Sequence, residues 1–93
     1  MQAPEPSCVP VVIEGVTLRK EKKRAFVIGK GVALIINRSA ARIIEGFDGV
    51  KSLGEIMEKL KHDYPNTDEK IIERDVLDLA LKLSDSKVVR FEK

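Results

Sequence analysis

The sequence predicts an α+β fold in which a three-stranded antiparallel sheet is followed by three helices and a possible short final strand. From Gly15 to Ile36, short apolar runs alternate with polar residues and are joined by brief links, as in a meander of half-buried strands. After Ile36 the apolar residues recur at helical spacing, and residues that favour helix N-termini precede each helical segment.

The segments "VTLRK", "RAFVIG" and "VALII" are the three expected strands. The charged link "EKK" indicates a hairpin between the first two, and "GKG" gives a tight turn into the third. The middle strand places Phe26 and Ile28 on one face and Ala25 and Val27 on the other. In a meander of this order, the third strand lies at an edge of the sheet.

The first expected helix follows the third strand directly. Asn37 or Ser39 is placed to cap it, and we expect it to run through Glu45. The pair "DG", formed by Asp48 and Gly49, is the expected stop signal.

Two longer helices are expected next. Ser52 and Glu55 form a capping box at the start of the second helix, which "YPNTD" ends. Thr67 or Asp68 caps the third and longest helix. Its expected core residues, which recur at helical spacing, are Ile72, Val76, Leu79 and Leu83. A final "KVVRF" is the possible closing strand.

The 93 residues, 43% of them hydrophobic, suffice for one small domain with a single core. Residues 1–10 contain three of the four prolines, which predicts a flexible tail over residues 1–11 that includes Cys8. We expect a single domain over residues 12–93. One cysteine excludes an internal disulfide and a cysteine-based metal site. The sequence shows neither a signal peptide nor a membrane-spanning run, so we expect a cytoplasmic protein without a membrane partner.

The residue types argue against an enzyme. His62 is the only histidine and lies near a helix end, where a solvent-facing role is common. Cys8 has no histidine near it in the sequence, and "GKG" lacks the spacing and the following helix of a phosphate-binding loop. We therefore expect no catalytic residue, no metal and no cofactor.

Nucleic-acid binding is the second class to weigh. The run "RKEKKR", from Arg19 to Arg24, contains five bases in six residues and can contact phosphates. However, the third helix, residues 68–85, has six acids against three bases, a net charge of −3. We therefore expect no nucleic-acid partner and keep a winged-helix nucleic-acid-binding or protein-interaction module as the alternative function. The basic run is then a solvated hairpin tip or a site for an acidic partner surface.

The order of several short motifs resembles the PqqD family, the recognition elements of ribosomally made, modified peptides. These motifs are "IIN", "AARII", "DG", "SLGEIMEKL" and "DVLDLALKL", and the resemblance extends over about residues 12–91. Two positions depart from the family pattern. The family often has Leu at the position of Ile36 and Gly at the position of Lys87.

The resemblance implies a winged helix-turn-helix-like domain without catalytic activity. Such domains bind the leader of a precursor peptide as a strand added to the third strand, in a groove shared with the third helix. They present the leader to a modifying enzyme, which for PqqD is a radical S-adenosylmethionine (SAM) enzyme.

The residues fit this expectation. An edge strand normally has Lys, Pro or a bulge as protection, yet residues 32–36 have none, and an unguarded apolar edge can pair with an extended peptide. On the third helix, two leucines beside an arginine lie off the core stripe. The candidate peptide-binding residues are Val32, Ala33, Leu34, Ile35, Ile36, Arg74, Leu77 and Leu81. The alternative is that "KVVRF" or a second copy covers this surface, and we expect a monomer or a weak homodimer.

Overall fold

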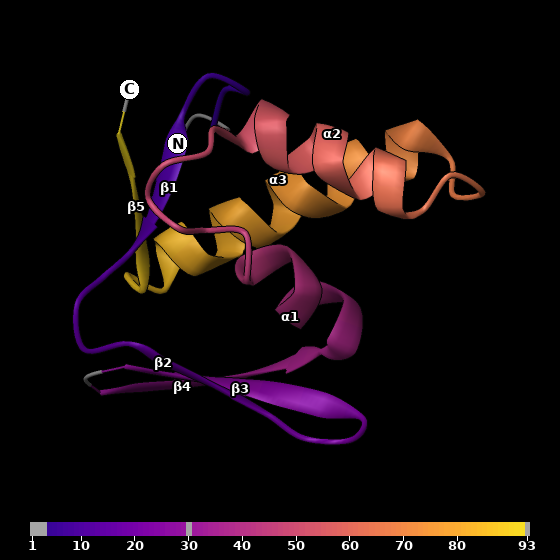
Figure 1. Cartoon of the computed structure of the whole chain (residues 1–93). Helices are drawn as coiled ribbons and strands as arrows, with labels where there is room; N and C mark the ends of the chain where they lie inside the picture. Colours follow the sequence, from indigo (N-terminus) through magenta and orange to yellow (C-terminus); the bar gives the residue numbers. More distant parts are fainter. Residues whose placement is uncertain (1–3, 30, 93) are drawn as a thin grey trace.

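The computed structural model describes residues 4–29 and 31–92. Its elements, in chain order, are β1 (Val9–Val12), β2 (Thr17–Lys20), β3 (Arg24–Gly29), β4 (Val32–Asn37), α1 (Arg38–Ile44), α2 (Leu53–Asp63), α3 (Glu69–Asp85) and β5 (Val89–Glu92). Figure 1 shows the β2–β4 sheet on one side of the molecule, α2 and α3 on the other, and α1 between them. The predicted α+β architecture is confirmed.

The main sheet is antiparallel with the strand order β2-β3-β4. Because side chains alternate between the faces of a strand, β3 has an inner and an outer face. Ala25 and Val27 are fully buried on the inner face. Phe26 is half-buried and Ile28 is exposed on the outer face. The smaller side chains of β3 therefore face the helices, and the larger ones face away.

A second sheet pairs the two ends of the chain, with β1 antiparallel to β5 and Val9 opposite Glu92. The expected closing strand is present, but it pairs with β1. The predicted flexible tail over residues 1–11 is wrong for residues 8–11, because Cys8 is only 7% exposed and the Pro10 side chain is fully buried. Residues 1–3 lie outside the described residues. β1 tolerates its proline because it is an edge strand.

Asn37 joins β4 to α1 and caps the helix. Its side-chain oxygen accepts a 2.7 Å hydrogen bond from the backbone N–H of Ala40. The helix ends at Ile44, so the prediction that Asp48 and Gly49 stop it is wrong. Two backbone bonds, from Gly46 to the Ile43 carbonyl and from Phe47 to the Ile44 carbonyl, tighten the final turn instead.

Asp48 and Gly49 shape the connection between α1 and α2. The carboxylate of Asp48 accepts hydrogen bonds from the backbone N–H groups of Val50 and Lys51, at 2.9 and 3.0 Å. Gly49 has a φ of 79°, which glycine adopts without the steric cost of a side chain. The pair forms a turn, as residues of this type do.

The N-termini of the two longer helices follow the sequence prediction. The Ser52 side chain accepts from the backbone N–H of Glu55, and the Glu55 side chain accepts in return from the N–H of Ser52. Of the two candidate caps for α3, Asp68 fills the role and accepts from the backbone N–H of Lys70 at 2.8 Å. Each cap therefore satisfies a backbone N–H that has no acceptor within its helix.

The C-terminus of α3 is a Schellman motif. The N–H of Val88 donates to the carbonyl of Leu83 at 3.1 Å, and the N–H of Lys87 donates to Ser84 at 3.0 Å. Lys87 has a φ of 63°, the left-handed conformation that this position requires. The family often has Gly at this position, and here a lysine takes the left-handed conformation that glycine favours.

One cluster of buried apolar side chains joins the inner face of the sheet to the helices and to the β1–β5 pair. The four predicted core residues of α3 are all buried. The largest fully buried side chains are Leu53, Leu83, Val27, Val76, Val88 and Pro10. Within the described residues, no helix combines the length and the apolar character needed to span a bilayer.

Candidate peptide-binding site

The site begins with the open side of β4. Among the described residues, β4 pairs with β3 alone, and it is the last strand of its sheet. β5 pairs with β1, so the closing segment does not cover β4. The backbone N–H and C=O groups along the free side of β4 are therefore available to an added strand.

The five candidate residues of β4 divide between the two faces of the sheet. Ile36 is buried on the inner face, and Val32 and Leu34 are half-buried there. Ala33 and Ile35 point outward, and Ile35 is 60% exposed. An added strand would share the inner face with Val32 and Leu34, whereas the outward pair faces solvent.

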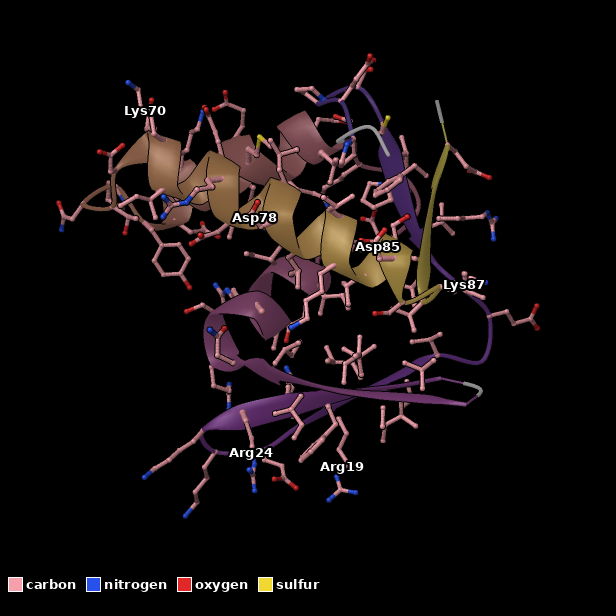
Figure 2. The ribbon with its side chains drawn as sticks, turned by 180° about the vertical axis from the view of Figure 1, so that it is seen from behind. Arg19, Arg24, Lys70, Asp78, Asp85 and Lys87 are labelled. Carbon is pink, nitrogen blue, oxygen red and sulfur yellow. The ribbon has the colours of Figure 1, made fainter. Side chains whose placement is uncertain are left out.

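A groove lies beside the end of β4, between α1 and α3. Its lining residues are Asn37, Ser39, Ala40, Ile43, Asp75, Asp78, Leu79 and Lys82. The α3 members recur at spacings of three and four residues and therefore form one flank of the helix. Figure 2 shows α3 above the sheet, with Asp78 and Asp85 of this helix labelled. We did not select this flank of α3 from the sequence, although the helical spacing of Asp75, Asp78 and Lys82 can be seen there next to the predicted core residues.

Leu77 and Leu81 lie on a different flank of α3. Glu73 accepts a 2.7 Å hydrogen bond from Lys61 of α2, so the Glu73 side of α3 faces α2. Leu77 and Leu81 follow Glu73 by about one and two helical turns. The structure therefore directs Leu77 and Leu81 toward the α2 side of α3, and Leu77 packs against the core. Arg74 precedes Asp78 by four residues and so lies one turn from the groove residues.

The groove adjoins an apolar pocket at the far side of α1. The guanidinium of Arg42 lies 6.0 Å from the centre of the Tyr64 ring at its mouth. Ser39, Ile43 and Asp75 line both the pocket and the groove. The pocket and the groove therefore share one wall, and the pocket can accept a side chain of an extended segment.

The groups with shifted pKa values belong to ion pairs and to a turn. The hydrogen bond to Glu73 raises the pKa of Lys61. The hydrogen bond from Lys20 lowers the pKa of Glu45. Hydrogen bonds from Lys51, chiefly from its backbone N–H, hold the pKa of Asp48 well below its usual range. In the described part of the chain, no group of three His, Cys, Asp or Glu side chains is arranged to hold a metal ion.

A comparison with protein-family models identifies the family of this chain. The model of the family described as coenzyme PQQ synthesis protein D (PqqD) matches residues 14–89. The chain belongs to the PqqD family. PqqD proteins are accessory proteins of natural-product biosynthesis that bind a precursor peptide and work with a modifying enzyme. Neither the curated proteins nor the solved structures gave a match.

Proposed function

We propose that this PqqD-family chain binds the leader of a ribosomally made precursor peptide as a strand added to β4 and presents it to a modifying enzyme of the radical SAM class. The observation behind the proposal is the free side of β4, which no described strand covers. It lies beside a groove between α1 and α3.

In this proposal, β4 and the groove contribute differently to recognition of the leader. Backbone pairing with β4 gives affinity that depends little on the leader sequence, and side-chain contacts select among leaders. Val32 and Leu34 offer apolar contact on the inner face. The groove flank adds two carboxylates, from Asp75 and Asp78, and the ammonium group of Lys82. We therefore revise the proposed contact set from the Leu77 flank of α3 to the Asp78 flank.

The test is a titration of the chain with any short precursor peptide that its genomic neighbourhood encodes, followed by calorimetry and by amide chemical shifts. The expected shifts cluster on β4 and on the Asp78 flank of α3. Shifts confined to the β2–β3 hairpin would overturn strand addition.

Two matched variants distinguish the flanks of α3. Asp78→Trp and Lys70→Trp each place a bulky ring at an exposed helix position. Asp78 lies on the groove flank, whereas Lys70 precedes Leu77 by seven residues and so lies on the Leu77 flank. Asp78→Trp should weaken peptide binding at least tenfold by filling the groove, and Lys70→Trp should change it less than twofold. The reverse result would restore the flank of Leu77 and Leu81 as the binding surface.

A further inference from the structure

The outer face of the β2–β4 sheet has an apolar patch that the fold leaves uncovered. The strand register places Phe26 opposite Ile35 and Ile28 opposite Ala33, so these four side chains share the outer face. Ile28 is 40% exposed and Ile35 is 60% exposed. We call these four residues the sheet patch. A contiguous exposed group of this kind on a small domain indicates an interaction surface.

Basic side chains surround the sheet patch. The guanidinium groups of Arg19 and Arg24 lie 5.7 and 5.6 Å from the centre of the Phe26 ring, within the range of a cation–π contact. Figure 2 shows both arginines on the side of the sheet away from α3. Lys22 and Lys23 at the hairpin tip are exposed.

One acid lies within this basic rim. Glu21 pairs with Arg19 at 2.9 Å and with Arg24 at 3.8 Å. From Arg19 to Arg24 there are five bases and one acid, a net charge of +4. Lys20 lies opposite Ala25 on the inner face and pairs with Glu45. The rim without Lys20 has four bases and one acid and keeps a net charge of +3.

We propose that the sheet patch is the docking surface for the modifying enzyme, through an apolar protein surface rimmed by acidic residues. This inference rests on the proposed function, because it assumes that the chain presents a peptide to an enzyme. The apolar centre gives contact area, and the basic rim selects acidic surfaces. Arginines stacked on an aromatic ring are already oriented to pair with carboxylates.

A second copy of the chain fits this surface poorly. In a symmetric dimer the same patch is used by both subunits. The basic rim of one copy, with its net positive charge, would then lie against the same rim of the other. An acidic partner has the complementary charge.

Single-stranded RNA is also disfavoured. Bases bind to sheets by stacking on accessible aromatic rings. Phe26 is the one aromatic side chain of the patch, and two guanidinium groups already lie over it. The other three members are aliphatic and offer no ring for stacking.

The position of the patch explains how a chain of this size can hold peptide and enzyme together. Ile35 contributes its side chain to the outer face, whereas the backbone of the same strand offers its free side to the peptide. An enzyme on the outer face leaves the groove between α1 and α3 open. The leader is therefore held beside the docked enzyme.

The experiment uses the full chain with a peptide-modifying enzyme and a precursor peptide taken from its genomic neighbourhood. One variant combines Arg19→Glu with Arg24→Glu, and a second is Ile28→Thr, which keeps strand propensity and removes apolar surface. Lys70→Glu is the control, because it also reverses an exposed charge but lies at the far end of α3, as Figure 2 shows. Thermal melting verifies that each variant is folded.

We expect the double arginine variant to bind the enzyme at least tenfold more weakly, with a smaller dependence on salt, and Ile28→Thr to bind severalfold more weakly. Peptide affinity should change less than twofold in both, and the Lys70→Glu control should match the wild type. Unchanged enzyme binding in both folded variants would overturn the inference. Displacement of the enzyme by single-stranded RNA would also overturn it. So would a wild-type dimer that dissociates when Ile28 is changed to Thr. Failure of the wild type to bind the peptide would instead contradict the proposed function.

Discussion

The backbone N–H of Leu53 donates a 2.8 Å hydrogen bond to the carbonyl oxygen of Cys8. The next N–H, from Gly54, donates to the carbonyl of Pro6 at 2.9 Å. These are the first two N–H groups of α2, which have no acceptor inside the helix. The N-terminal segment therefore satisfies the start of α2, in addition to placing β1 against β5.

Deleting residues 1–12 should destabilise the fold. The deletion removes β1, the buried side chains of Cys8 and Pro10, and the two acceptors for α2. Two lost hydrogen bonds alone cost about 2 kcal/mol, and the lost apolar burial adds to this. Thermal melting of the truncated chain tests it, with Ser7→Ala as the control because Ser7 is exposed. An unchanged melting temperature after truncation would show that the N-terminal segment is dispensable.

Asn37→Ala should cost about 1 kcal/mol of the free energy of unfolding, because it removes the N-cap of α1. Ser39→Ala should have little effect, since the Asn37 side chain already accepts from the N–H of Ala40. Urea denaturation of the two variants compares them directly. Equal losses in both would mean that the cap is shared.

Lys87→Gly should stabilise the chain by about 0.5–1 kcal/mol. A left-handed conformation costs a non-glycine residue about 1–2 kcal/mol, and the greater freedom of glycine in the unfolded chain offsets part of that gain. Asp85→Gly is the matched control, since it places glycine inside the last turn of α3 and should destabilise by about 1 kcal/mol. A loss of stability for Lys87→Gly would indicate that the lysine side chain makes a stabilising contact.

The turn at Asp48 should make stability sensitive to acid. Its pKa is lower in the folded chain than the unfolded value of about 3.9, so its contribution is complete above about pH 5 and is lost as the pH falls through the folded pKa. Asp48→Asn keeps an acceptor oxygen but cannot titrate. The difference in free energy of unfolding between wild type and Asp48→Asn should shrink from neutral pH toward about pH 2. A constant difference would contradict this assignment.

Local signals predicted much of the fold correctly. The capping box of Ser52 and Glu55 needs only residues three apart, and the core stripe of α3 needs only helical periodicity. β1 gave no such signal because its partner is at the other end of the chain, where Val9 meets Glu92. A proline within a run of four residues also lowers its expected strand propensity.

The candidate site was predictable only in part. The edge position of β4 followed from the meander order alone. The sequence could not show which flank of α3 lines the groove beside β4. Helical periodicity gives the angle between Leu77 and the core stripe, but it does not show which neighbouring helix or strand each flank contacts. The Lys61–Glu73 pair, 2.7 Å apart, and the groove that includes Asp78 fix that orientation through contacts between distant segments.

The pairing of β1 with β5 also determines how the protein can be fused to another protein or immobilised on a surface. It places the first and last strands side by side, and in Figure 1 the start of β1 and the end of β5 lie on the side of the molecule away from the β2–β4 sheet. A fluorescent protein, a sensor surface or a fused enzyme linked through either end would leave the peptide edge and the outer sheet face open. Fusions in both orders should therefore be equally usable, and a single immobilised chain can present the same binding face whichever end is anchored.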